Sequence, residues 1–356
     1  MKTAVLKKNS EIIIVEKNIP LVKPDECLIK VNSCGICSSD IYRSHDNGAY
    51  FYPLTMGHEF SGQIIKVGSE KTEMKINDRV TVFPLLPCFS CDSCIKKEFT
   101  TCSSYKYYGS RNDGGFAEYI AIKNWNLIKT NQIDPLDASL LEPLSVVVHA
   151  LKKISLFNED IKIKENHKIC LIGCGFLGLM MSEILIKKFE FNEISIIDRN
   201  SFKLNKVLNA RSVVKNHLVS DKEWDSYLNL NKNNFDTVIE ISGNHKNFRR
   251  SLHLSKPKGR ILWMGNIDNN LNLKKQEVSM ILRKELKISG SWNSNYKSPD
   301  DDWKSSIDLI EKKIVLPSRF ITKKISLNEF PEYMKILFNH KMRKKRQDYI
   351  KYNVVF

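Results

Sequence analysis

The sequence has no long hydrophobic run, no internal repeat and no low-complexity linker. No apolar stretch approaches the roughly 20 residues that a membrane-spanning helix needs. The first residues, MKTAVLKKNSEIIIVEK, carry charges on both sides of an apolar run that is too short for an export signal. We therefore expect a cytoplasmic protein without a membrane partner.

The charge is basic, but no nucleic-acid-binding signature accompanies it. The chain has 56 Lys and Arg against 40 Asp and Glu, a formal net charge of +16. An excess of this kind favours polyanions. The basic residues are scattered, however, apart from KMRKKR at 341–346, and we find no helix-turn-helix, zinc-finger or RNA-binding motif. We expect a solvated surface and no nucleic-acid partner.

Cysteine is present in an odd number, which argues against a disulfide framework. Of the nine cysteines, four are clustered in CFSCDSCIKKEFTTC, and the others are dispersed. The dispersed ones are Cys27, Cys34, Cys37, Cys170 and Cys174. Without an export signal, this pattern favours metal ligands or buried thiols.

The chain of 356 residues is long enough for two packed domains. Up to about residue 145, short alternating segments such as EIIIVE, ECLIKVN and RVTVF predict antiparallel strands of a barrel-like domain. Beyond it, apolar runs such as KICLI, ISIID and DTVIEI alternate with amphipathic stretches. That alternation predicts a doubly wound parallel sheet, so the fold class is α/β with a mainly-β domain beside it.

A glycine motif predicts a dinucleotide site in the second domain. In KICLIGCGFLGLMM, Gly173, Gly175 and Gly178 follow a strand and open a helix, with Phe176 and Leu177 inside the motif. These glycines permit a tight turn, close approach of a pyrophosphate and close helix packing. Asp198 closes the next strand and can accept hydrogen bonds from both ribose hydroxyls, which favours NAD over NADP. Arg199 beside it weakens that preference, and a glycine turn that merely packs is the alternative interpretation.

The clustered cysteines predict a structural zinc site. Cys88, Cys91, Cys94 and Cys102 have the spacing C-x2-C-x2-C-x7-C, and four thiolates complete a tetrahedral zinc site. Such a site has no open position for substrate, so it should order its loop rather than carry the reaction. Four free thiols or two disulfides are the alternatives.

A catalytic zinc needs an open position, and its ligands must therefore lie elsewhere. CGICSSD offers Cys37 with Ser39 and Asp40, MGHEFSG offers His58 and Glu59, and LLEPLSV offers Glu142. Each has an ordinary structural interpretation when taken singly. Spacing alone cannot bring together ligands that lie so far apart in the sequence.

The order of these motifs resembles the zinc-dependent polyol branch of the medium-chain dehydrogenase/reductase superfamily across essentially the whole chain. YPLTMGHEFSG, PLLPCFSC, GSRNDGGFAEYI and ILRKELKISGSW are similar, in particular, to the galactitol-1-phosphate 5-dehydrogenase family. The resemblance implies a GroES-like catalytic domain of residues 1–145 and 286–356, with a structural zinc lobe at 88–102. The NAD-binding Rossmann domain, 146–285, is inserted between these parts, and the active site lies in the cleft.

The resemblance also assigns roles to single residues. Two zinc ions per chain are implied, one structural at the cysteine tetrad and one catalytic on Cys37, His58 and Glu142, with Glu59 as an exchanging ligand. Asp40 matches the acid that orients the histidine, and Ser39 matches the hydroxyl that starts a proton relay. The family suggests homodimers or homotetramers.

The implied reaction is oxidation of galactitol 1-phosphate to tagatose 6-phosphate with hydride transfer to NAD. Candidate substrate contacts are Arg43, Tyr50, Arg111, Trp292, Tyr296 and Lys297. The basic ones would hold the phosphate and the aromatic ones would line the pocket, although solvated charges and core packing are the alternatives. Tyr50 departs from the family pattern, as does Ser38, so an unphosphorylated polyol of the sorbitol or butanediol type stays open. A non-catalytic zinc protein is the rival from another class.

Overall fold

The computed structural model describes residues 1–356 except 47, 156–166, 192, 208–213 and 343–347. Most of the basic run at 341–346 therefore lies outside the described residues. The chain forms two compact units, Met1–Ser145 with Asn295–Phe356, and Val146–Ser294. Among the described residues, no helix is both long and apolar enough to cross a membrane.

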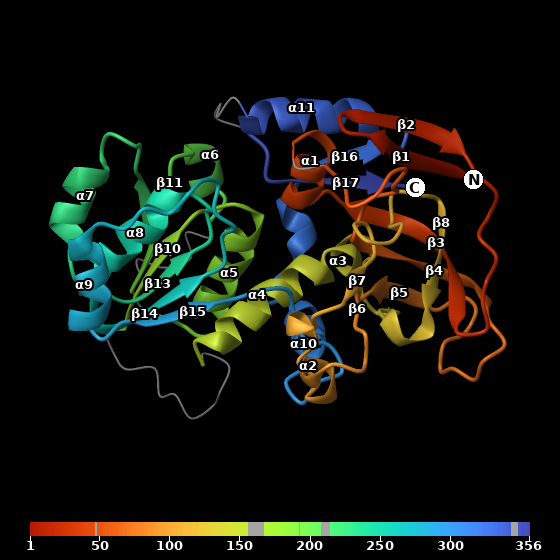
Figure 1. Cartoon of the computed structure of the whole chain (residues 1–356), viewed down its shortest axis with the longest axis horizontal. Coiled ribbons are helices and arrows are strands. Elements are labelled where there is room, and N and C mark those ends of the chain that lie inside the picture. The colour runs from red at the N-terminus through yellow and green to blue at the C-terminus, as the bar shows by residue number, and fades with distance from the viewer. Residues whose placement is uncertain (47, 156–166, 192, 208–213, 343–347) are drawn as a thin grey trace. The chain divides into compact units, whose positions relative to one another are not determined.

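The first unit is built on a mixed, mainly antiparallel sheet in the order β16-β17-β3-β4-β5-β9, with β8 paired to β3 (Figure 1). Its strands are β3 (Glu26–Gly35), β4 (Glu59–Val67), β5 (Arg79–Val82), β8 (Tyr119–Lys123), β9 (Leu127–Lys129), β16 (Ile321–Ser326) and β17 (Lys351–Val355). Two separate antiparallel pairs accompany it: β1 (Lys2–Lys8) with β2 (Glu11–Glu16), and β6 (Leu85–Leu86) with β7 (Lys106–Tyr107).

The helices of the first unit are short, and several begin or end near the site residues. They are α1 (Ser38–His45), α2 (Asp92–Ile95), η1 (Phe99–Thr101), η2 (Asn124–Asn126), α3 (Pro135–Ser139), α10 (Asp302–Glu311), η3 (Pro317–Phe320) and α11 (Phe330–Met342). Helix α4 (Leu141–Lys153) begins in this unit and runs into the second.

The second unit is a six-stranded parallel sheet in the order β12-β11-β10-β13-β14-β15. Its strands are β10 (Lys168–Ile172), β11 (Glu193–Asp198), β12 (Val214–Leu218), β13 (Phe235–Glu240), β14 (Ser255–Trp263) and β15 (Lys287–Gly290). Its helices are α5 (Phe176–Lys187), α6 (Ser201–Leu204), α7 (Trp224–Asn231), α8 (His245–Leu254) and α9 (Lys275–Arg283). The predicted α/β fold class is confirmed.

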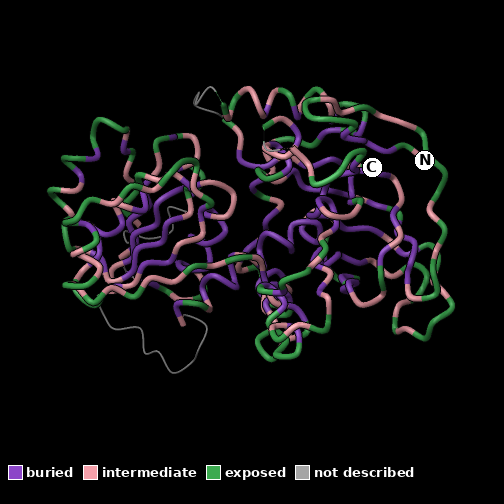
Figure 2. The backbone as a smooth tube through the Cα atoms, in the orientation of Figure 1, coloured by how far each residue is buried: buried purple, intermediate pink, exposed green. Residues whose placement is uncertain are grey.

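In each unit the buried residues follow the strands (Figure 2). Aliphatic residues of β3, β4 and β5, with Phe116 and Phe330, form the core of the first unit. Residues of β10, β11 and β13, with Trp224 and Tyr227, form a core cluster in the second. Both cores therefore draw mainly on residues of the strands.

One predicted boundary differs from the structure. The sequence predicts a return to the catalytic domain at residue 286, but β15 pairs with β14 and completes the parallel sheet, and the unit extends to Ser294. Strand β15 is KISG, four residues with one aliphatic side chain, and none of them is fully buried. It lacks the apolar run that identifies a central parallel strand in the sequence.

Candidate active site

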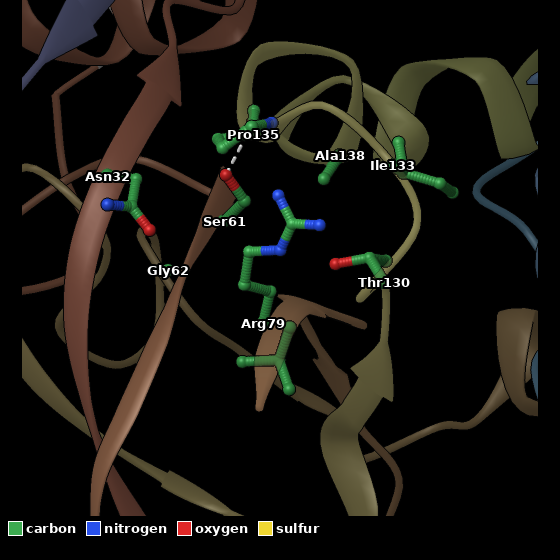
Figure 3. A pocket seen from close by; sticks show the side chains of 9 residues that line it. Asn32, Ser61, Gly62, Arg79, Thr130, Ile133, Pro135 and Ala138 are labelled. Atoms are coloured by element: carbon green, nitrogen blue, oxygen red, sulfur yellow. Dashed lines mark hydrogen bonds between the residues drawn. The ribbon is translucent and has the colours of Figure 1, made fainter. Parts of the chain in front are cut away.

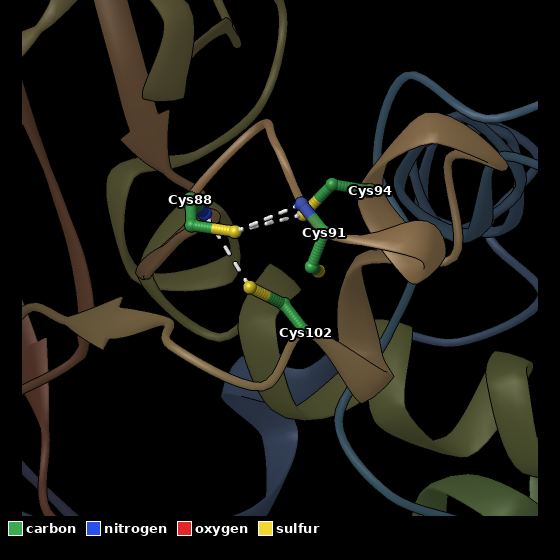
Figure 4. Close-up of side chains that lie close together, drawn as sticks. All are labelled: Cys88, Cys91, Cys94 and Cys102. Carbon is green, nitrogen blue, oxygen red and sulfur yellow. Dashed lines mark hydrogen bonds between the residues drawn. The ribbon is translucent and has the colours of Figure 1, made fainter.

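The four clustered cysteines come together in the segment that contains α2 and η1, with Cys94 in α2 itself (Figure 4). Their Sγ atoms all lie within 4.8 Å of one another, and the Cys88 and Cys94 sulfurs are 3.8 Å apart. The backbone N–H of Cys91 donates to Cys88 Sγ, and that of Cys88 donates to Cys102 Sγ. All nine cysteines of the chain are free thiols. Four sulfurs in this arrangement fit a closed tetrahedral zinc site.

Local hydrogen bonds prepare the tetrad for a metal. The Cys88 sulfur accepts hydrogen bonds from the backbone N–H and the hydroxyl of Ser90 and from the backbone N–H of Cys91. These bonds lower the pKa of Cys88 to about 5. The thiolate is the form that binds zinc. Burial, with the neighbouring thiols, raises the pKa of Cys94 to about 12. Cys94 therefore loses its proton readily only when a cation is bound, so metal binding is coupled to proton release.

Aromatic side chains attach this lobe to the rest of the first unit. The rings of Phe89 and Phe99 meet the ring of Trp125 edge to face, at centroid distances of 5.0 and 5.5 Å. Trp125 in turn contacts Phe83 and Tyr296. The lobe has little apolar content of its own, so these contacts and the four thiols define its position.

A second group of metal-ligating atoms lies where β3 leads into α1 and β4 begins. Gly35 of β3 is paired with Glu59 of β4, so Cys37, two residues further on, comes close to His58 and Glu59. The ligand atoms of these three residues lie within 4.8 Å of one another. His58 and Glu59 are buried. A thiol, an imidazole and a carboxylate are a donor set that zinc accepts, with a fourth position left over.

Asp40 lies behind the histidine. It is fully buried, and its Oδ1 is 3.4 Å from His58 Nδ1 and accepts a hydrogen bond from Arg43 Nη1 at 3.1 Å. Its Oδ2 accepts from the Cys37 N–H. Burial opposes ionisation of Asp40, but His58 and Arg43 outweigh it and lower the pKa. With Nδ1 turned to Asp40, the ring offers Nε2 to a metal, as outer-shell carboxylates usually arrange.

The electrostatics around His58 favour a bound cation. Burial alone would lower the pKa of His58, but Asp40 and Cys37 outweigh it and raise the pKa well above its ordinary value. A proton and a metal ion respond to the same negative potential at this position. The environment therefore suits a divalent cation on chemical grounds as well as geometric ones.

Glu142 lies beside this group, on the first turn of α4, but it does not belong to the set of three mutually close ligands. Its carboxyl is buried, and its Oε1 accepts a hydrogen bond from the Tyr107 hydroxyl at 2.9 Å. Burial first, and then the charge of Glu59, raise the pKa of Glu142 to about 7. The structure thus brings two carboxylates, Glu59 and Glu142, to one site.

Two further residues of this site, Tyr107 and Lys351, are not indicated by any motif in the sequence. Tyr107 is half-buried next to His58, with ring centroids 5.8 Å apart, and its hydroxyl donates to Glu142. Lys351, in the last strand, forms a buried ion pair with Glu59. The one available signal for Lys351 was a lysine placed among the apolar residues of YIKYNVVF.

The predicted substrate residues are placed differently from one another. Arg43 is bonded to Asp40, and Lys297 donates to the Trp125 carbonyl. Tyr296 is buried and donates its hydroxyl to the Leu127 carbonyl. Trp292 is exposed and belongs to the second unit. Arg43, Tyr296 and Lys297 therefore each have a local hydrogen-bond partner.

Arg111 has a different environment. Its guanidinium lies 4.3 Å from the ring centroids of both Tyr50 and Tyr105, and its Nη2 donates to the Tyr50 hydroxyl at 3.1 Å. The Tyr105 ring contacts Tyr107, whose hydroxyl reaches Glu142. A chain of aromatic contacts therefore connects Arg111 with the Glu142 carboxylate.

A small hollow lies elsewhere on the sheet of the first unit (Figure 3). It is lined by Asn32, Ser61, Gly62, Arg79, Val80, Thr130, Ile133, Pro135 and Ala138. The Ser61 hydroxyl donates to the Pro135 carbonyl across it. None of the predicted site residues is among the lining residues.

The glycine motif has the geometry of a pyrophosphate loop. Gly173 has φ +110, and a Cβ on Gly178 would lie 2.2 Å from the Gly173 carbonyl oxygen, so both positions require glycine. Gly175 caps α5 and has open space where its side chain would be. A phosphate can therefore approach the helix N-terminus closely, as dinucleotide sites require.

The loop also positions the predicted ribose ligand. Asp198 ends β11, and its carboxylate accepts hydrogen bonds from the N–H groups of Cys174 at 2.7 Å and Asn200 at 2.9 Å. Phe176 and Leu177, in the first turn of α5, are half-buried, and Arg199 is exposed. Asp198 is thus fixed against the glycine loop itself.

Comparisons with known proteins agree with this arrangement. Residues 23–132 match the family described as alcohol dehydrogenase GroES-like domain, and residues 177–312 match zinc-binding dehydrogenase. The chain is 33% identical to galactitol 1-phosphate 5-dehydrogenase of Escherichia coli K12 over 89% of its length and 90% of that protein. It is 27% identical to sorbitol dehydrogenase of Bacillus subtilis over 94% and 92%.

A solved structure is similar over the whole chain. The crystal structure of galactitol-1-phosphate dehydrogenase from Escherichia coli has a TM-score of 0.86 and 29% sequence identity, with 100% of both chains covered. That similarity covers both of the units described above.

Proposed function

Since the chain belongs to the zinc-dependent medium-chain dehydrogenase/reductase superfamily, we propose that it oxidises a secondary hydroxyl of a polyol phosphate, with hydride transfer to NAD. The expected substrate is galactitol 1-phosphate and the expected product tagatose 6-phosphate. The observation that supports the proposal is the group of half-buried Cys37 with buried His58 and Glu59, and with Asp40 behind the imidazole. We expect a cytoplasmic homodimer or homotetramer.

Two zinc ions per chain fit the donor atoms. Cys88, Cys91, Cys94 and Cys102 would hold one, and Cys37 and His58 would hold the other together with Glu59 or Glu142. The second zinc, when bound, supplies a Lewis acid for the substrate hydroxyl, and NAD accepts the hydride. The protein's part is to bind and orient the polyol and to remove its proton.

Ser39 is the proposed first carrier of that proton. It lies on the first turn of α1 directly after the metal ligand Cys37 and Ser38, and its side chain is exposed. Its hydroxyl can take the proton from the substrate and pass one to solvent. Asp40, fully buried, holds His58 in one tautomer while this happens.

The choice of NAD rests on Asp198. Its carboxylate is held at the glycine loop by two backbone N–H groups, where it can accept hydrogen bonds from both ribose hydroxyls. A 2′-phosphate at the same position would meet a negative charge. We therefore expect NAD to be preferred over NADP, even with Arg199 beside it.

Arg111 is the proposed ligand of the substrate phosphate. Two tyrosine rings hold its guanidinium, and a planar guanidinium can bind a phosphate through two parallel hydrogen bonds. Arg43 is paired with the buried carboxylate of Asp40, whereas the partners of Arg111 are neutral tyrosines, which supports Arg111 over Arg43.

A substrate panel tests the proposal: kcat/KM for galactitol 1-phosphate, free galactitol and sorbitol, each with NAD and with NADP. We expect the phosphorylated polyol with NAD to be preferred. Arg111→Met should raise KM for the phosphate ester by about 10- to 100-fold, because charge-assisted hydrogen bonds worth about 1.5–3 kcal/mol are lost. KM for free galactitol should stay unchanged, which serves as the control.

The alternative is an enzyme of the sorbitol or butanediol type, for which the sorbitol dehydrogenase relative argues. A higher kcat/KM for an unphosphorylated polyol would establish it. A non-catalytic zinc protein is the less favoured rival, and it predicts one tightly held zinc per chain and no reduction of NAD with any member of the panel.

A further inference from the structure

Lys351 forms a buried ion pair with Glu59, one of the candidate metal ligands. The side chains of Lys351 and Glu59 are only 4% and 2% exposed, and Nζ contacts Oε2 of the carboxylate. Nζ also donates to the Ile36 carbonyl at 3.0 Å. The ammonium group therefore has at least two partners, the Glu59 carboxylate and the Ile36 carbonyl.

Strand register brings these groups together. In β3, Gly35 is paired on one side with Glu59 of β4 and on the other with Asn353 of β17. A Cβ on Gly35 would lie 2.2 Å from Glu59 Oε2 and 3.0 Å from Lys351 Cε. Because Gly35 has no side chain, the ion pair can occupy the space that a Cβ would fill.

The two carboxylates of the site have partners of different charge. Glu59 has one oxygen on the ammonium of Lys351, and an oxygen within 4.8 Å of the ligand atoms of Cys37 and His58. Glu142 is bound by the neutral hydroxyl of Tyr107. A cationic partner competes with a metal ion for a carboxylate, whereas a neutral donor does so much less.

We propose that Lys351 is a positioning residue that keeps Glu59 a weak, exchangeable ligand of the metal at Cys37 and His58. By holding the carboxylate through its charge, it lets Glu59 give up its place to substrate or to Glu142. The inference rests on the proposed function, because it presupposes a metal at this site. It assigns to a residue of the last strand an influence on how that metal is coordinated.

The test compares Lys351→Met with the unaltered chain, both loaded with cobalt(II) in place of zinc. Without the competing charge, Glu59 should stay on the metal. We expect loss of the more labile metal to a chelator to slow by about tenfold or more. We also expect the visible absorption of cobalt to weaken, as it does when a four-coordinate ion gains a fifth ligand, and kcat to fall.

A purely structural lysine gives the opposite result. Loss of a group that merely orients a ligand weakens metal binding by about 10- to 100-fold. Faster metal loss in Lys351→Met, or unchanged cobalt absorption, would therefore overturn the inference. Lys324→Met, which removes an exposed lysine from the neighbouring strand β16, is the matched control for net charge and should behave like the unaltered chain.

Lys351→Arg keeps the experiment decisive if Lys351→Met does not fold. A guanidinium can bind both carboxylate oxygens, so it should hold Glu59 more firmly and speed metal loss. Slower metal loss in this variant would contradict the inference. Failure of the proposed function is separate: an unaltered chain that binds one metal only would show it, before any variant is compared.

Discussion

The two groups of metal-ligating side chains differ in where their members come from. The cysteine tetrad comes from one stretch, Cys88 to Cys102, and uses four sulfurs. Cys37, His58 and Glu59 come from the end of one strand and the start of another, with Glu142 and Lys351 added from still more distant segments. A closed site is local and self-sufficient, whereas the proposed open site depends on the whole sheet around it.

Removing one ligand of the open site should have the largest effect. We expect Cys37→Ser to lower kcat by about a thousandfold or more, because charge stabilisation worth several kcal/mol is lost with the metal. Zinc content should fall from about two to about one per chain. Metal analysis and steady-state kinetics measure both, and retention of two zinc ions would show that Cys37 is no ligand.

The carboxylate behind the open site should have an intermediate effect. Asp40→Asn keeps the shape of the buried side chain but removes the charge that faces His58 and Arg43. Outer-shell changes of this kind lower metal affinity by about 10- to 100-fold. Competition with a chelating dye measures the affinity. Asp92→Asn, an exposed acid on α2 next to the tetrad, is the matched control.

Breaking the tetrad should have the smallest effect on the chemistry. We expect Cys91→Ser to lose one zinc and to lower the melting temperature, because a structural zinc contributes folding free energy. The kcat of the folded fraction should change by less than about twofold. The variant is the counterpart of Cys37→Ser, and a loss of kcat as large as in that variant, at a temperature where the chain is folded, would remove the distinction between the two sites.

The same difference decides what could be predicted from the sequence. The tetrad and the glycine motif are contiguous, so their spacing alone indicates their chemistry, and the alternation of apolar runs predicts the fold class. Cys37, His58 and Glu142 could be proposed together only through resemblance to a family. What brings Cys37 to His58 is the pairing of Gly35 with Glu59, and register between strands is a tertiary property.

Other features of the site and the fold could be identified only in the folded structure. Lys351 is ordinary in the sequence, and only the position of β17 next to β3 gives it a buried carboxylate as partner. The predicted role of Tyr296 depends on exposure, and its hydroxyl is buried against Leu127. Strand β15 has too little apolar content to be recognised, so the predicted boundary at residue 286 falls short of the end of the unit at Ser294.

The interrupted course of the first unit has a consequence for synthesis on the ribosome. Strands β16 and β17 are translated after the entire second unit, although they belong to the sheet that begins with β3. Domains generally fold as units while the chain is being made. The contiguous second unit can therefore be complete while the first still lacks the edge of its sheet, and the ammonium beside Glu59 is among the last groups to arrive.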